Sequence, residues 1–390
     1  MTGRVHGSVH TGFAAVRDVL SEHLSAGLDL GFSFCAYHRG EVVADLWGGH
    51  VDVDRRLDWL PTTLLPLTSI TKTVLTTTLW RLAELGDVDI EAPVSSYWRE
   101  FGANGKADIT VATVMSHRAG IPAFPDPITL ADELEWWPVV RKIQNLSPLW
   151  KPGEAHGYHA IVLGFLTSEL IRRVTGAPAS AAVRTHVIDP LGIDLHMSLS
   201  SDDTRRLAEV LPPSDDQVPE VVPAGQREYV AGFVDQDSLL YRATFGSTAM
   251  TFKDMNNPAY HSTERPAAYG NAHAVAKMFA ALVSDIPEGR LLSPRSVRMA
   301  ALERSSGMDE VFRLPTRWAG GFMLPGGPLW PDFGRPAFGH IGSTGALAFA
   351  DPEYEFSFAF LPNKMKSVYE VPDRRAQALI RTCYAALEGM

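Results

Sequence analysis

Apolar residues recur at helical spacing in one part of the N-terminal region and in strand-like runs in the next. Between positions 13 and 24 they stand three and four residues apart, which predicts a helix that ends before Gly27. Positions 32–37 and 42–47 form two apolar runs on either side of a turn that contains Gly40. The chain is therefore predicted to begin with a helix and an antiparallel hairpin.

The C-terminal region mirrors this arrangement. Runs at 346–350 and 355–361 flank the turn Asp351-Pro352-Glu353 and predict a second hairpin, and a helical pattern over 372–387 closes the chain. Both ends thus supply antiparallel strands and a terminal helix. We predict a mixed α/β (α+β) fold, in which an antiparallel sheet is flanked by the two terminal helices.

The middle of the chain shows helical patterns and few strand signals. The helical stretches are 70–85, 130–143, 160–173, 177–186, 272–282 and one that begins at Ser293-Pro294. We predict an α/β lobe from residues 1–65 and 275–390, with a mainly helical lobe inserted at 66–274. Within it, residues 205–268 have little periodicity, which favours a lid or a pocket wall.

Length and composition support two lobes and an ordinary globular protein. The chain has 390 residues, of which 45% are hydrophobic and 21% charged, whereas one core rarely organises more than about 300 residues. The net charge of −10 disfavours nucleic acid and anionic membrane surfaces as partners, because both repel an acidic chain. We expect a small-molecule substrate, and the sequence leaves the oligomeric state open.

Cysteine usage and the N-terminus bear on location. No run of about 18 apolar residues predicts a transmembrane helix, and the first residues lack the charged and apolar regions of a secretory signal. Cys35 and Cys383 are far apart and without metal-ligand spacing, so we expect neither a disulfide framework nor a zinc ribbon. We therefore expect the protein in the cytoplasm.

The sharpest candidate for chemistry is Ser69-Ile70-Thr71-Lys72 at the start of the helical stretch 70–85. A serine in the first helical turn lies where the helix dipole favours negative charge, and a lysine three residues later lies on the same face. An alcohol needs a neighbouring base to become a nucleophile, and lysine serves only if its pKa is lowered. By itself the tetrad fits better a capping serine followed by a surface lysine, so its context has to decide.

Further motifs follow the tetrad along the chain. They are Trp150-Lys151-Pro152-Gly153, Tyr158-His159-Ala160 and, before the last hairpin, Phe338-Gly339-His340-Ile341-Gly342-Ser343-Thr344-Gly345. With the connecting segments 86–94 and 110–122, they resemble the serine hydrolases of the class C β-lactamase and penicillin-binding-protein superfamily over about residues 10–385. Within it, the sequence looks most like the family VIII carboxylesterases and related transacylases. The resemblance implies a β-lactamase/transpeptidase-like fold.

The resemblance also implies roles for individual residues. Ser69 would be the nucleophile, and Lys72 and Tyr158 would share the general-base work, with the first base left open. The backbone N–H groups of Ser69 and Ser343 would form the oxyanion hole. Tyr158 also fits a core aromatic residue with a satisfied hydroxyl.

Two departures from the lactamase pattern concern substrate binding. His340-Ile341-Gly342 stands where the lactamases have Lys-Thr-Gly, and Ala160 replaces the asparagine of Tyr-x-Asn. The cation, hydroxyl and amide that help to hold a β-lactam are therefore missing, which favours neutral ester or amide substrates. We also expect a falling pH, towards 6, to protonate His340 and make the site more tolerant of anions.

We therefore predict a serine carboxylesterase that hydrolyses small to medium acyl esters through an acyl-enzyme. The alternatives are a transacylase or an amidase/D-peptidase on the same fold and, more distantly, a non-catalytic binding protein. We expect no cofactor and no metal, since His156 and His159 lack a third ligand nearby in the sequence. His117 is expected to support a turn.

Overall fold

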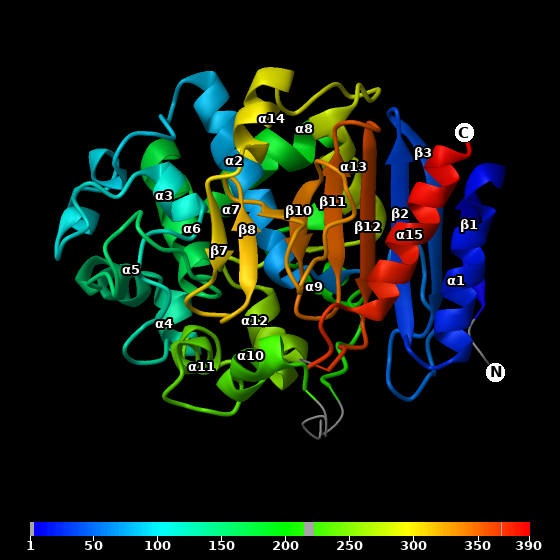
Figure 1. The fold of residues 1–390 in the computed structure, drawn as a ribbon, viewed down its shortest axis with the longest axis horizontal. Coiled ribbons are helices and arrows are strands. Elements are labelled where there is room, and N and C mark those ends of the chain that lie inside the picture. Colours follow the sequence, from blue (N-terminus) through cyan, green and yellow to red (C-terminus); the bar gives the residue numbers. More distant parts are fainter. Residues whose placement is uncertain (1–3, 214–221, 368) are drawn as a thin grey trace.

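The computed structural model describes residues 4–213, 222–367 and 369–390 (Figure 1). Part of the predicted lid or pocket wall, at 214–221, lies outside the described residues. In the described ranges, one large sheet has nine strands in the order β1-β3-β2-β12-β11-β10-β9-β8-β7, and every neighbouring pair is antiparallel. The strands are β1 (Val5–Val9), β2 (Gly31–His38), β3 (Glu41–Gly49), β7 (Ser305–Met308), β8 (Pro315–Trp318), β9 (Met323–Leu324), β10 (Phe338–Ile341), β11 (Leu347–Asp351) and β12 (Phe356–Pro362).

Helices cover both faces of this sheet. α1 (Ala14–Ser25) and α15 (Arg374–Glu388) lie side by side on one face, and α13 (Ala272–Val283) packs on β2, β11 and β12 from the other (Figure 1). Along β2, Phe32 and Phe34 belong to the hydrophobic core that includes α1 and α15, whereas Cys35 belongs to the core that includes α13. Strands buried on both faces have no polar alternation, which explains the continuous apolar runs. The predicted antiparallel sheet flanked by terminal helices is confirmed.

The middle of the chain is mainly helical. Its helices are α2 (Thr71–Leu85), α3 (Val111–Met115), α4 (Leu130–Glu135), α5 (Trp137–Asn145), α6 (Val162–Thr175), α7 (Ala179–Val183), α8 (Asp189–Leu191), α9 (Ser201–Thr204), α10 (Arg227–Gly232), α11 (Leu239–Ala243) and α12 (Pro258–His261), and α14 (Pro294–Ala301) follows α13. A small sheet, β4-β6-β5, joins Leu65–Pro66, Tyr269–Gly270 and Leu195–His196. The two-lobe division stays a prediction, and its limit at residue 275 falls inside α13.

The structure differs from the predicted elements at one helix and at several strands, including β8 and β9, where no strand was predicted. The helix predicted over 130–143 is broken at Trp136, whose φ is 63°. Pro138 cannot donate a backbone hydrogen bond to the preceding turn, so α5 starts afresh. The edge strands β1 and β7 were not predicted, because most of their residues are exposed and carry no apolar alternation.

Two further observations concern the helices and the cysteines. Among the helices in the described ranges, none has both the length and the apolar character needed to cross a bilayer. Cys35 and Cys383 are both buried and unpaired.

Candidate active site

Ser69 lies in a tight turn between a strand of the small sheet and a buried helix. β4 leads into the 3₁₀ turn Thr68–Ile70, and α2 continues directly from it. Thr68 has a φ of 47°, a left-handed conformation that is costly for a β-branched residue. α2 ends at Leu85, and the next residue, Gly86, has a φ of 87° that lets the chain leave the helix. The serine is thereby fixed at the N-terminal end of a rigid element.

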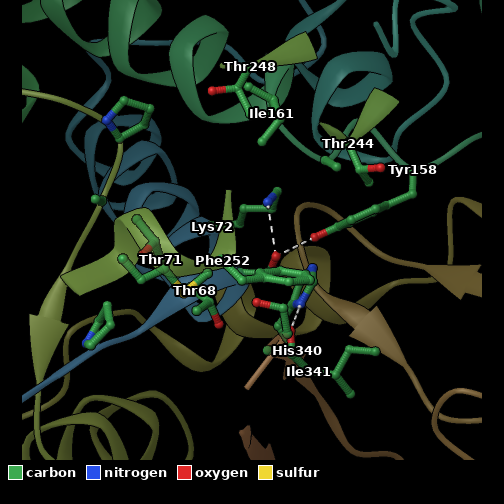
Figure 2. Close-up of a pocket in the computed structure, with 18 of the residues that line it drawn as sticks. Thr68, Thr71, Lys72, Tyr158, Ile161, Thr244, Thr248, Phe252, His340 and Ile341 are labelled. Atoms are coloured by element: carbon green, nitrogen blue, oxygen red, sulfur yellow. Dashed lines mark hydrogen bonds between the residues drawn. The ribbon is translucent and has the colours of Figure 1, made fainter. Parts of the chain in front are cut away.

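Two side chains meet at the Ser69 hydroxyl. Lys72 Nζ lies 3.3 Å from Ser69 Oγ, and the Tyr158 hydroxyl donates to the same oxygen at 2.7 Å (Figure 2). Lys72 Nζ also lies 5.1 Å from the centre of the Tyr158 ring. The structure thus brings together the three residues that the sequence singled out, although Tyr158 is 89 positions from Ser69.

Burial changes the protonation of both partners. It lowers the pKa of Lys72 to about 7, because the ammonium form loses its hydration. It raises the pKa of Tyr158 well above the usual value for a phenol, although the hydrogen bond with Ser69 opposes this. Near neutral pH, Lys72 is therefore present in substantial amounts as a free amine, whereas Tyr158 is a neutral phenol. The Lys72 amine can therefore accept a proton, and the Tyr158 phenol can donate one.

Tyr158 is fixed by residues from the β7–β8 region. Its ring stacks between Phe312, at a centroid distance of 4.7 Å, and Trp318, at 5.4 Å. The buried carboxylate of Asp309 accepts the backbone N–H groups of Tyr158 and Phe312, at 3.1 and 2.9 Å, and the hydroxyl of Thr316. Sequence reasoning missed Asp309 and Phe312, because no motif links them to Tyr158.

The histidines beside Tyr158 support the backbone. His117, at a φ of 61°, accepts the His159 N–H on Nδ1 at 3.0 Å. His159 Nε2 accepts the Ile121 N–H at 3.1 Å, so its Nδ1–H donates to the Gly157 carbonyl at 2.6 Å. Burial lowers the pKa of His159 to about 4. Because the backbone occupies both His159 nitrogens, this neutral imidazole is a structural support rather than a metal ligand.

His340, on β10, is buried beside Tyr158. Its Nδ1 lies 2.6 Å from the Ile341 carbonyl and must carry the proton, which leaves Nε2 as an acceptor without a hydrogen-bond partner among the described residues. Burial, with a smaller contribution from Lys72, lowers the pKa of His340 to about 3. The expectation that His340 becomes protonated as the pH falls towards 6 is therefore wrong. The sequence identifies an imidazole but not its burial.

These groups open onto one cavity of about 320 Å³. Every residue predicted to bind or react lines it: Ser69, Lys72, Tyr158, Ala160, His340, Ile341, Gly342 and Ser343. The described part of the segment 205–268 supplies much of the opposite wall. Its aromatic contributors are Tyr229, Phe233, Phe245, Phe252 and Tyr260, and Tyr269 follows them. The site is a mainly apolar pocket with a few polar groups at one end, as is common for small-molecule sites.

Gly342 lets the end of β10 approach the nucleophile turn. A Cβ there would lie 2.4 Å from Thr68 Oγ1, so Gly342→Ala is expected to push the two segments apart. A displacement of about 1 Å can cost about 10²-fold in rate. We expect a loss of that order in kcat for an ester, measured beside Gly225→Ala, where a Cβ meets nothing within 4 Å. Equal activity of the two variants would contradict the close packing.

Comparisons with known proteins agree with this geometry. The family model described as Beta-lactamase matches residues 20–382. "Esterase/beta-lactamase LipL" of Mycobacterium tuberculosis is 30% identical over 378 residues, covering 95% of this chain and 85% of the relative. A crystal structure of a family VIII carboxylesterase has a TM-score of 0.87 and 31% identity, covering 98% of this chain and 100% of the other. A penicillin-binding-protein homologue from Caulobacter crescentus has a TM-score of 0.84 and 32% identity, covering 98% and 99%.

Proposed function

The chain belongs to the β-lactamase family and is a serine hydrolase of the esterase type, and from this we propose that it is a carboxylesterase for small to medium acyl esters. The observation that carries the proposal is the pair of contacts on Ser69 Oγ, from Lys72 at 3.3 Å and Tyr158 at 2.7 Å. Family membership sets aside the non-catalytic binding protein. We also propose a cytoplasmic location, which suits two buried, unpaired cysteines.

In the proposed mechanism, Lys72 is the first base. Its free amine takes the proton of Ser69 as Oγ attacks the ester carbonyl, and the backbone N–H groups of Ser69 and Ser343 bind the oxyanion. Tyr158 supplies a proton to the departing alkoxide and is reprotonated from the Lys72 ammonium. A water molecule then attacks the acyl-Ser69 ester, and its proton follows the same route. The pKa values of the two side chains support this division of labour.

The pocket supports a neutral substrate. His340 presents a neutral ring whose Nε2 is an acceptor, so it repels a carboxylate oxygen rather than binding it. Apart from Lys72, two basic residues line the cavity, and one of them, Arg265, is paired with the buried Glu133 at 3.0 Å. Lys366 donates to the Glu370 carbonyl, and burial lowers its pKa. An anion entering this pocket would lose its hydration with little compensation.

We expect kcat/KM for p-nitrophenyl butyrate to exceed that for nitrocefin, a β-lactam carboxylate, by at least about 10²-fold, since unpaired burial of an anion costs several kcal/mol. Because the pKa of His340 is about 3, protonation of His340 should not change this ratio between pH 6 and 8. Both substrates can be followed by absorbance with one enzyme preparation. Nitrocefin turnover comparable to butyrate turnover would overturn the esterase proposal.

A further inference from the structure

A second group of reactive side chains lies away from the catalytic cavity, on the sheet face that α13 covers. Cys35 on β2 and Asp45 on β3 are directly opposite each other in the antiparallel register. His273, in the first turn of α13, reaches both. The described lining of the catalytic cavity includes none of the three. This group needs an explanation that the esterase chemistry does not supply.

The geometry distinguishes between a catalytic relay and a metal site. His273 Nδ1 lies 2.9 Å from Asp45 Oδ2 and 3.9 Å from Cys35 Sγ. A Cys-His-Asp catalytic relay requires the thiol and the carboxylate on opposite nitrogens of the ring, and here both face the same nitrogen. One sulfur, one nitrogen and one oxygen atom, all within 4.8 Å of one another, instead surround a common point. Ligand atoms around a tetrahedral zinc ion are roughly 3.3–3.7 Å apart, so small side-chain rotations suffice.

We propose that Cys35, Asp45 and His273 bind a single zinc-like divalent cation, with a fourth position open to water. The donor set of thiolate, imidazole and carboxylate suits zinc rather than magnesium or calcium, which prefer oxygen ligands alone. The Asp45 and His273 side chains are 32% and 42% exposed, which gives the ion a route from solvent. A thiolate and a carboxylate together neutralise a divalent charge.

The surroundings of His273 support this assignment. Its Nε2 lies 3.1 Å from the Tyr37 hydroxyl, which can accept the ring N–H when Nδ1 binds the metal. Metal-binding histidines commonly have such a partner, and losing it typically costs about 10–100-fold in affinity. Cys35 would bind the metal as the thiolate, so binding releases its proton and should tighten as the pH rises.

The site can be tested with Co²⁺, whose thiolate complexes absorb in the near ultraviolet. After dialysis against a chelator, we expect the full-length protein to bind one equivalent with a sulfur-to-cobalt band that Zn²⁺ abolishes. Cys35→Ser should lose the band, whereas Cys383→Ser, the matched control at the other buried cysteine, should keep it. No saturable binding, or the same band in Cys35→Ser, would overturn the proposal.

Two milder variants guard against misfolding of Cys35→Ser. His273→Gln, at a partly exposed side chain, is expected to weaken Zn²⁺ binding at least tenfold by isothermal titration calorimetry. Tyr37→Phe should weaken it about tenfold while preserving the one-to-one stoichiometry. Unchanged affinity in both variants would contradict the site. Esterase activity is expected to be the same with and without metal, so this test is independent of the proposed reaction.

Discussion

Replacing Ser69 with alanine is expected to lower kcat for p-nitrophenyl butyrate by at least about 10⁴-fold, because no acyl-enzyme can then form. The variant should keep its fold, because the serine hydroxyl contacts two side chains that line the cavity, Lys72 and Tyr158, rather than the backbone of a helix or strand. Circular dichroism and the melting temperature will show whether this holds. Ester hydrolysis is measured by release of nitrophenolate.

Covalent labelling tests whether Ser69 is the nucleophile without measuring a reaction rate. A fluorophosphonate should add one mass increment to the wild-type chain, on the peptide that contains Ser69, and none to Ser69→Ala. Ser21→Ala is a suitable control, because Ser21 lies exposed on α1 and its hydroxyl bonds, among the described residues, only to the Arg17 carbonyl. A label on another residue, or substantial turnover in Ser69→Ala, would refute the assignment of Ser69 as the nucleophile.

The contact between Ser69 and Lys72 was predictable because it depends on local geometry. Ser69 and Lys72 are three positions apart at the beginning of a helix, and helical periodicity alone places them on one face. Tyr158 was predictable only through the resemblance, since 89 positions separate it from Ser69. Asp309 was not predictable. Its contribution is to accept backbone N–H groups, which leaves no trace in residue type or spacing.

The fold shows the same limit. The inner strands β2 and β12 were predicted because both of their faces are buried and their apolar runs are continuous. The edge strands β1 and β7 were missed, because pairing on one side and exposure impose no apolar pattern. The group of Cys35, Asp45 and His273 likewise depends on strand register and helix packing, neither of which sequence spacing reveals.

The choice between Lys72 and Tyr158 as first base predicts a pH profile. With its pKa lowered to about 7, Lys72 is protonated and inactive as a base below that pH, and free above it. We therefore expect kcat/KM to rise tenfold per pH unit in the acidic range and to level off above about pH 8. Tyr158, with its pKa raised, would yield phenolate only in strongly alkaline solution. Rates of p-nitrophenyl ester hydrolysis between pH 5 and 9 test this.

The Lys72→Arg variant tests whether Lys72 or Tyr158 is the first base. Arginine keeps the positive charge and much of the length but cannot deprotonate, so kcat/KM should fall by about 10²–10⁴-fold and the ionisation near pH 7 should disappear. Tyr158→Phe should lose a similar factor while keeping that ionisation, because Lys72 remains. Lys151→Arg, at an exposed lysine paired with Glu154, is the matched control and should behave as wild type. If Lys72→Arg kept the ionisation near pH 7 and Tyr158→Phe lost it, tyrosine would be the first base and the proposed order of proton transfers would be reversed.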